Sequence, residues 1–259
     1  MKKLLLLAMT FVFMFSFTAC SGGSFLSDKD ILEVSANPEA TIVLEYDLGD
    51  SQGARQVELV FELCYDKAPS TVANFIKLAK DEYYNGKIID FADVNEGTSD
   101  LSYISGGRYN LDEEENIIDD AKNYNIKGEF IANKWDKNDL KHKLGSLVMD
   151  RDFGSGAAFD TASTRFYITL NENVSRDRNY CVFGQIKSSK YSVGSAKFDA
   201  SNSLSRLFID DMLAITCEQK TTKDGKLTLT QVPKNNIVIK SVSINENGTD
   251  YSKAKVAKA

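Results

Sequence analysis

Alternation of apolar and polar side chains is the clearest pattern in this 259-residue chain, and it predicts a mostly β fold. Gln56 to Leu63 alternates without a break, and Thr41 to Tyr46 is a similar run of β-branched and aromatic residues ahead of it. Later runs of the same kind are expected to be strands at 87–94, 101–104, 144–149, 165–170, 180–184, 226–230 and 237–244. Because turn residues separate many of these runs, we expect consecutive strands of an antiparallel sheet.

Two segments instead repeat apolar residues every three or four positions, which is typical of helices with one buried face. The first runs from Pro69 to Tyr84, with proline in its opening turn and the Ser70 and Thr71 hydroxyls close by as capping groups. The second lies between Leu204 and Ile215. Both helices are expected to pack against the sheet.

Three polar segments are predicted to be irregular. Leu111 to Tyr124 is acidic, but it lacks the ligand spacing and central glycine of a calcium loop, so a solvated surface loop is favoured. Lys187 to Asn202 is polar and rich in serine, which favours a loop before the second helix. Residues 246–259 are expected to be a disordered tail.

The N-terminus has the order of an export signal: a basic start, an apolar stretch from Leu4 to Phe17, and small residues before Cys20. Phe17 to Cys20 resembles a bacterial lipobox, in which the cysteine is lipidated; the alternative is an ordinary cleaved signal. We predict a lipoprotein signal peptide at 1–19 and a lipidated Cys20 that opens a flexible tether over 20–39. This places the protein in a bacterial cell envelope, outside the cytoplasm and lipid-anchored to a membrane.

Composition and charge narrow the chemistry. The chain is 42% hydrophobic, enough for one buried core, and its formal net charge of −6 offers no basic face to nucleic acid. Cys64, Cys181 and Cys217 allow one disulfide, although buried free thiols are favoured. His142 is the single histidine, which argues against a metal site of several histidines and favours a structural or surface role. Because no phosphate-binding glycine loop is present either, we expect neither a metal nor a cofactor.

Several short motifs occur in one order along the chain. They are Lys67 to Phe75, Gly106-Gly107, Gly128-Glu129-Phe130, Lys141 to Met149, Ser163 to Ile168 and Val182-Phe183-Gly184. Together these motifs resemble the cyclophilin family, and the resemblance spans a single domain at 40–245. It implies a cyclophilin-like closed eight-stranded antiparallel β-barrel capped by two α-helices.

The resemblance also implies an activity, because cyclophilins are peptidyl-prolyl cis-trans isomerases. The family uses an arginine as hydrogen-bond donor and a glutamine beside it, without metal or cofactor. In this chain the arginine position holds Phe91 or, in a second alignment, Asp93, and the glutamine position holds Ser105. The catalytic residue is therefore unknown, and we expect reduced activity.

The resemblance further implies which residues line the peptide groove. They are Phe91, Asp93, Tyr103, Ser105, Met149, Asp150, Arg165, Phe166, Tyr167 and Tyr180. Four arginines are candidates to replace the missing cation: Arg108, Arg151, Arg165 and Arg176. Arg165 is the best placed by the resemblance, although a pair with Asp93 or Asp150 would neutralise it equally well.

Two functions of different classes follow from these observations. The first is a membrane-anchored, monomeric peptidyl-prolyl cis-trans isomerase that binds proline-containing segments of exported proteins and assists their folding. The second is a non-catalytic cyclophilin-like lipoprotein whose groove binds a peptide or a partner protein. A proline-isomerisation assay separates the two.

Overall fold

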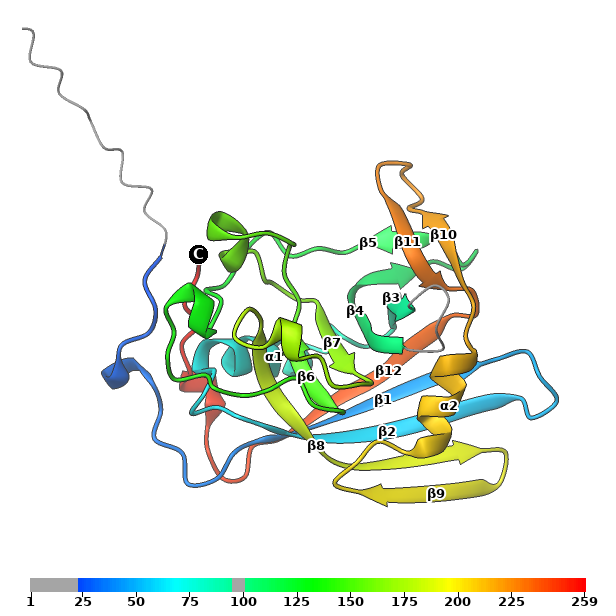
Figure 1. Cartoon of the computed structure of the whole chain (residues 1–259), viewed down its shortest axis with the longest axis horizontal. Helices are drawn as coiled ribbons and strands as arrows, with labels where there is room; N and C mark the ends of the chain where they lie inside the picture. The colour runs from blue at the N-terminus through cyan, green and yellow to red at the C-terminus, as the bar shows by residue number, and fades with distance from the viewer. Residues whose placement is uncertain (1–22, 95–100) are drawn as a thin grey trace, which may run out of the picture.

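The computed structural model describes residues 23–94 and 101–259, and eight of the described strands close into an antiparallel barrel (Figure 1). Their order around the barrel is β2-β1-β12-β3-β4-β7-β6-β8, and β8 pairs again with β2 to complete the ring. The predicted eight-stranded barrel with two α-helices is therefore confirmed. The predicted signal peptide and Cys20 lie outside the described residues.

The bounds of the elements are as follows. The barrel consists of β1 (Glu39–Asp47), β2 (Ala54–Leu63), β3 (Lys87–Val94), β4 (Leu101–Leu111), β6 (Ser146–Met149), β7 (Phe166–Thr169), β8 (Cys181–Val193) and β12 (Ile237–Asn245). Outside the ring lie β5 (Ile117–Asp119), β9 (Ala196–Ser201), β10 (Cys217–Thr221) and β11 (Thr228–Pro233). The helices are α1 (Pro69–Lys80) and α2 (Arg206–Ala214), and 3₁₀ turns occur at η1 (Asp28–Asp30), η2 (Ile131–Asn133), η3 (Gly156–Asp160), η4 (Val174–Arg176) and η5 (Tyr251–Lys253).

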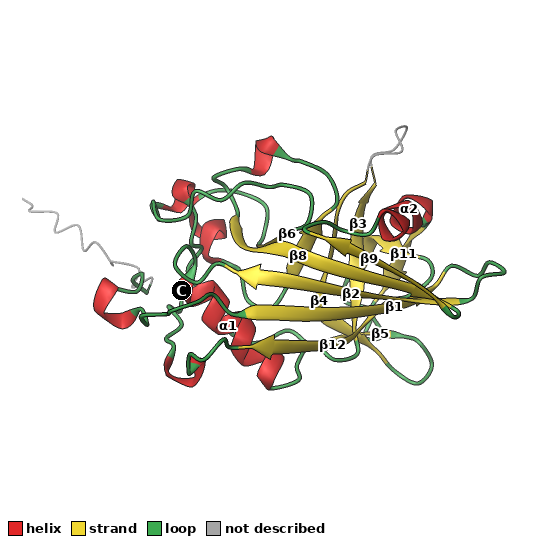
Figure 2. Cartoon of the chain, turned by 90° about the horizontal axis from the view of Figure 1, so that it is seen from below, coloured by secondary structure: helices red, strands yellow, loops and turns green. Residues whose placement is uncertain are grey.

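The alternation seen in the sequence separates the inside of the barrel from its outside. In β2, Val57, Leu59, Phe61 and Leu63 are fully buried, while the residues between them are more exposed. Because side chains alternate across a strand, one face of β2 fills the barrel and the other meets solvent. The core continues from the barrel onto α1, which covers one end, while α2 lies at the other end (Figure 2).

The first turn of α1 is stabilised by a carboxylate from a distant loop. Glu129 accepts hydrogen bonds from the main-chain N–H groups of Ser70, at 3.0 Å, and Thr71, at 2.8 Å. A carboxylate is favourable at a helix N-terminus, and the predicted capping hydroxyls make no capping hydrogen bond. The helix also ends at Lys80 rather than at Tyr84, because Tyr84 turns back into the core.

One carboxylate joins α2 to the barrel. Asp211 Oδ2 accepts hydrogen bonds from the hydroxyls of Tyr46 and Tyr191, each at 2.8 Å. The same oxygen lies 3.1 Å from Nε of Arg55, whose side chain is only 1% exposed and also pairs with Asp50 at 2.5 Å. A buried guanidinium needs such partners, so Asp211 ties the helix to β1, β2 and β8.

Some segments predicted to be irregular are strands. β8 continues through the serine-rich segment and forms a hairpin with β9, so the loop predicted at 187–202 is wrong. The reason is the pairing of β8 with β2, which gives the backbone of that segment its hydrogen-bond partners. The strand predicted at 226–230 does not close the barrel, because β11 pairs with β10 in a separate two-stranded sheet. Within the acidic segment, β5 forms a short pairing with β4.

The two ends of the described chain lie side by side and pack on the body (Figure 1). Tyr251 and Ala257 are buried, and the Ala257 N–H donates a hydrogen bond of 2.7 Å to the Ser70 hydroxyl, so residues 246–259 are not the predicted disordered tail. Lys255 forms an ion pair of 2.6 Å with Asp30, which lies in the predicted tether. That tether is therefore ordered from residue 23 onward.

Two further observations concern the predicted anchor and disulfide. Within the described ranges, no helix is long and apolar enough to cross a membrane. Cys64, Cys181 and Cys217 are free thiols, as favoured from the sequence, and burial raises the pKa of Cys181 above its ordinary range.

Replacing Asp211 with asparagine is expected to lower the free energy of unfolding by about 3 kcal/mol, because the buried Arg55 guanidinium loses one of its two carboxylate partners. Asp210→Asn on the same helix is the matched control, since Asp210 is about half exposed and its one ion pair within the described residues is with Arg206. The control is expected to lose less than about 1 kcal/mol. Urea unfolding measures both, and equal losses would contradict the assigned role of Asp211.

Candidate functional site

Three neighbouring strands, β3, β4 and β7, bring predicted site residues into one row. Phe91 lies opposite Ser105, and Ser105 lies opposite Tyr167. Directly paired residues of antiparallel strands project from the same face, so the three side chains share one surface. Tyr167 lies in an apolar cluster separate from the main core, whereas its neighbour Phe166 belongs to that core. The row therefore faces outward from the barrel.

Aromatic rings cover this outward surface. Tyr103 lies over Tyr167, with ring centroids 4.7 Å apart, and Tyr180 lies 6.1 Å from Tyr167 on another side. We call Tyr103, Tyr167 and Tyr180 the tyrosine cluster, and Phe91 stacks on its edge at 5.7 Å from Tyr103. Tyr167 has no exposed surface, while Tyr103 and Tyr180 are half-buried. The floor of the predicted groove is thus covered by the protein's own side chains.

A guanidinium group lies in the tyrosine cluster. The Cζ atom of Arg176, from η4, is 4.4 Å from the ring centroid of Tyr103, 5.1 Å from that of Tyr180 and 5.5 Å from that of Tyr167. Its Nη2 donates a hydrogen bond of 3.1 Å to the Tyr103 hydroxyl. These distances are those of cation–π contacts. Arg151 also lies beside the cluster, with its Cζ 4.3 Å from the Tyr180 ring centroid, but its guanidinium donates to main-chain carbonyls of the neighbouring loops. Arg176 is thus the candidate arginine that contacts all three rings, whereas the favoured Arg165 pairs with carboxylates.

His142 lies directly behind the tyrosine cluster and is nearly fully buried. Its Nε2 is 3.0 Å from the Tyr167 hydroxyl, and its Nδ1 is 3.1 Å from Asp177 Oδ1. Burial lowers the pKa of His142 below its ordinary value, although Asp177 opposes this effect. We therefore assign a neutral ring that donates from Nδ1 to Asp177 and accepts at Nε2 from the Tyr167 hydroxyl. This confirms a structural place for the histidine, in contact with the site.

The favoured Arg165 is neutralised by carboxylates. Its Nη2 lies 2.7 Å from Asp90 Oδ1, and its Nη1 lies 3.3 Å from Asp150 Oδ2. Asp150 Oδ2 is also 3.1 Å from the Ser105 hydroxyl. Burial of Asp90 raises the pKa of its carboxyl to about 6, even though Arg165 acts to lower it. Of the two pairings considered from the sequence, that with Asp150 occurs, and the second partner is Asp90 rather than Asp93.

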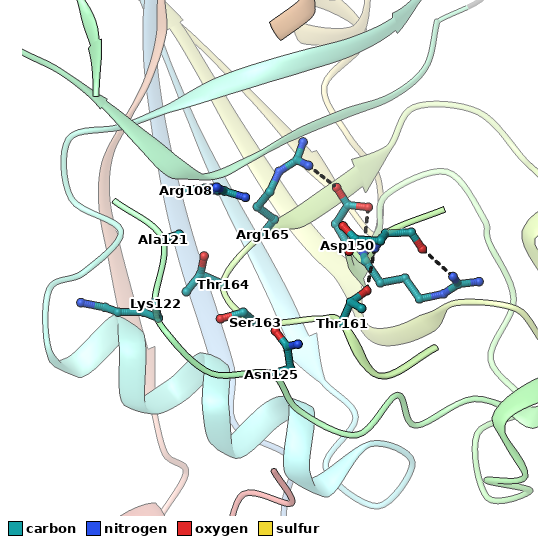
Figure 3. Close-up of a pocket in the computed structure, with 11 residues that line it drawn as sticks. Arg108, Ala121, Lys122, Asn125, Asp150, Thr161, Ser163, Thr164 and Arg165 are labelled. Carbon is teal, nitrogen blue, oxygen red and sulfur yellow. Dashed lines mark hydrogen bonds and ion pairs between the residues drawn. The ribbon is translucent and has the colours of Figure 1, made fainter. Parts of the chain in front are cut away.

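A cavity of about 180 Å³ adjoins this ion cluster. Figure 3 shows Arg165 reaching from it toward Asp150, with the other lining residues around it. The lining is Arg108, Ala121, Lys122, Asn125, Asp150, Arg151, Asp152, Thr161, Ser163, Thr164 and Arg165. Four of these side chains are cationic and two are carboxylates, and the rest are mostly hydroxyl or amide groups. The cavity therefore suits a polar or acidic side chain.

The remaining predicted residues are placed differently. Met149 and Phe166 are buried in the main core, and the Phe166 ring contacts Phe75 at a centroid distance of 5.7 Å. Their side chains therefore point away from the groove. Asp93 lies farther along β3 and is half-buried. Its negative charge adds to the effect of burial, which raises the pKa of Tyr103 to about 12 although Arg176 acts to lower it.

Comparison with known proteins gives a consistent family. Residues 50–200 match the family model described as "Cyclophilin type peptidyl-prolyl cis-trans isomerase/CLD". A peptidyl-prolyl cis-trans isomerase of Helicobacter pylori is 30% identical over 137 residues, which cover 51% of this chain and 68% of that protein.

Solved structures that this chain matches include a cyclophilin type peptidyl-prolyl cis-trans isomerase of Cryptosporidium parvum, determined in the presence of the dipeptide Ala-Pro. The match has a TM-score of 0.48 at 17% identity and covers 80% of this chain and 98% of that one. A second structure of the same enzyme has a TM-score of 0.48 at 18% identity and covers 81% and 98%.

The protonation state of His142 is directly measurable, because the chain contains one histidine and so gives one imidazole resonance. We expect its pKa, followed by NMR between pH 4 and 8, to lie below the ordinary value of about 6.5, since burial disfavours the charged ring. In Tyr167→Phe the ring loses a hydrogen-bond partner but should still titrate below that value. A pKa at or above 6.5 in the unmodified protein would contradict the assignment.

Proposed function

The chain belongs to the cyclophilin-type peptidyl-prolyl cis-trans isomerases, and from this we propose that it is a membrane-anchored isomerase of reduced activity that assists the folding of exported proteins. The anchor in this proposal is a lipid on Cys20. Its clients are proline-containing segments of proteins that fold outside the cytoplasm.

Proline isomerisation makes and breaks no covalent bond. Rotation about an X-Pro bond crosses a barrier of about 18–20 kcal/mol, because the twisted state loses amide resonance. A site accelerates rotation by holding the proline and by donating a hydrogen bond that is stronger in the twisted state than in the planar one. No bond is broken, so neither a metal nor a nucleophile is required.

The position of Phe91 is the observation that supports reduced activity. It lies on β3 opposite Ser105, at the row where the family resemblance implies an arginine opposite a glutamine. A phenylalanine cannot donate a hydrogen bond there, and loss of a preorganised donor typically costs 10²–10³ in rate. The burial of Tyr167 also supports reduced activity, because a proline ring can reach the aromatic floor only when neighbouring side chains move.

The cationic cavity supports recognition of an extended peptide beside the groove. It is bounded by Arg165 and Asp150, which also contact Ser105 in the groove row. Of its cations, Arg108 is paired with Asp119, whereas the Lys122 ammonium lies over the ring of Tyr83. A carboxylate or amide side chain of a client, a few residues from the proline, fits this chemistry.

The ordered N-terminal segment supports a short connection to the membrane. Asp28 pairs with Lys137, Asp30 pairs with Lys255, and the Leu32 N–H donates to the Tyr65 hydroxyl at 3.3 Å. A lipid on Cys20 would therefore hold the domain close to the bilayer rather than at the end of a long tether, with clients approaching near the membrane surface.

The alternative function, a non-catalytic module that binds a peptide or a protein, is favoured by one specific observation. Arg165 is fixed between Asp90 and Asp150, so the cation best placed by the family resemblance has no free charge to offer. Binding without catalysis would then be the remaining use of the groove.

The discriminating experiment is a proline-isomerisation assay on a soluble form that starts after Cys20. We expect kcat/KM to be at least tenfold below that of a cyclophilin with arginine on the corresponding strand, because the donor on β3 is missing. A value within tenfold would contradict reduced activity. No measurable rate, together with peptide binding by calorimetry, would favour the alternative.

Placing an arginine in the groove row tests the site assignment. Phe91→Arg is expected to raise kcat/KM, because position 91 lies opposite Ser105, whereas Asp93→Arg is expected not to. Both variants place an arginine on the same strand and differ in register, although Asp93→Arg also removes a carboxylate. An increase in Asp93→Arg alone would overturn the assignment of Phe91.

A further inference from the structure

We infer that Arg176, from the turn between β7 and β8, supplies the hydrogen-bond donor for proline rotation in this groove, so that the activity left without an arginine on β3 depends on it. This inference rests on the proposed function. It assigns a catalytic role to a residue on an element different from the one implied by the family resemblance.

The first support is where Arg176 lies. Its guanidinium contacts all three rings of the tyrosine cluster, and Nη2 donates to the Tyr103 hydroxyl. Phe91 stacks against Tyr103, with ring centroids 5.7 Å apart. Arg176 is half-buried, so the guanidinium borders the groove while part of it still reaches solvent. A client proline that packs on Phe91 and Tyr103 would therefore lie next to a cation.

The second support is that its charge is not neutralised by a carboxylate. In the part of the chain that the structure describes, no carboxylate lies within ion-pair distance of Arg176, whereas Arg165 has two such partners. The Tyr103 and Tyr167 hydroxyls are neutral, because burial raises the pKa of Tyr103 to about 12 and that of Tyr167 well above its ordinary value. A guanidinium has five N–H donors, so several remain for a client amide.

The third support is preorganisation of the turn that carries Arg176. On one side, the Asn173 N–H donates to the His142 carbonyl at 3.1 Å. On the other, Asp177 accepts from the main-chain N–H of His142 at 2.9 Å and lies 3.1 Å from its ring Nδ1. Both flanks of Arg176 are thus tied to one buried histidine. A donor held in this way needs little reorganisation during the reaction.

The Tyr167 hydroxyl links this histidine to the cation. Because its proton is directed to His142 Nε2, its oxygen lone pairs are left for the Arg176 side. In this scheme the Tyr167 hydroxyl, which a phenylalanine would lack, holds the Arg176 guanidinium over the aromatic rings. Tyr167 and His142 are positioning residues in this scheme.

The proposed step forms and breaks no covalent bond. As the X-Pro bond twists, the prolyl nitrogen becomes pyramidal and its lone pair localises, so a hydrogen bond from an Arg176 N–H strengthens in the twisted state. The proton stays on the guanidinium, which is always charged in proteins. When the bond becomes planar again, the hydrogen bond weakens and the product is released.

The test compares Arg176→Met with Arg206→Met in a proline-isomerisation assay on the tetrapeptide Ala-Ala-Pro-Phe. We expect Arg176→Met to lower kcat/KM by about 10²-fold, because the donor is lost while the aliphatic stem is retained. Arg206→Met removes the same charge from an exposed position on α2, outside the groove, and should leave the rate unchanged. Unfolding midpoints of both variants establish that they are folded.

Tyr167→Phe is the second variant, because it keeps the ring that packs against Tyr103 and removes only the hydroxyl. We expect a loss of about tenfold in kcat with KM unchanged, since positioning of Arg176 is weakened and the apolar contact with the client is not. A purely structural role would lower the unfolding midpoint without this separation of kcat from KM.

A measurement independent of rate completes the design. The Nε–H resonance of Arg176, assigned by its disappearance in Arg176→Met, should shift when the tetrapeptide is added. An active protein whose Arg176→Met variant is unchanged or faster would overturn this inference and leave the proposed function standing; a faster variant would mean that Arg176 blocks the groove. A protein without measurable isomerisation would overturn both the inference and the isomerase function.

Discussion

Pairing of β8 with β2 is the interaction on which the rest of the molecule depends. It joins nine residue pairs, from Arg55–Val193 to Leu63–Gly184, and turns an open sheet into a ring. Closure fixes which face of every strand is inside, so Ile168 and Phe166 fill the barrel and Tyr167 points out. A slip of one residue in this register would exchange those faces, and the groove row would be lost. The site is thus a consequence of how the ring closes.

Much of the fold is predictable from the sequence, and the exceptions share a physical cause. The alternation in β2 and the apolar repeats in α1 identify those elements, because the spacing of their own apolar residues determines which face is buried. The serine-rich half of β8 shows no such pattern, since its regularity comes from hydrogen bonds to β2 rather than from its side chains. The same holds for residues 246–259, where single contacts such as that of Ala257 with Ser70 impose order on a polar segment.

Some residues of the candidate site are predictable from the sequence and others are not. Phe91, Ser105 and Tyr167 are predictable, because motifs place them on strands and the strands then meet. The sequence names Arg176 as one of four candidates but does not single it out, and it does not link His142 to the site. Both residues contact Tyr167, and those contacts depend on the path of the turn that carries Arg176. The charged neighbours Lys141 and Lys143 favour an exposed histidine, so the local sequence does not reveal that His142 is buried. Which arginine keeps free donors is decided by where carboxylates and main-chain carbonyls lie in three dimensions, since carboxylates hold Arg165 and carbonyls hold Arg151.

The position of β12 also constrains when the protein can fold. This strand lies between β1 and β3 in the barrel, although it is formed by residues 237–245, near the end of the chain. A polypeptide that emerges from its N-terminus onward can pair β1 with β2 early, but it cannot close the ring between β1 and β3 until residues 237–245 have appeared. Because contacts between strands far apart in sequence are slow to form, the wall of the barrel keeps a gap at this place until β12 inserts between its two neighbours.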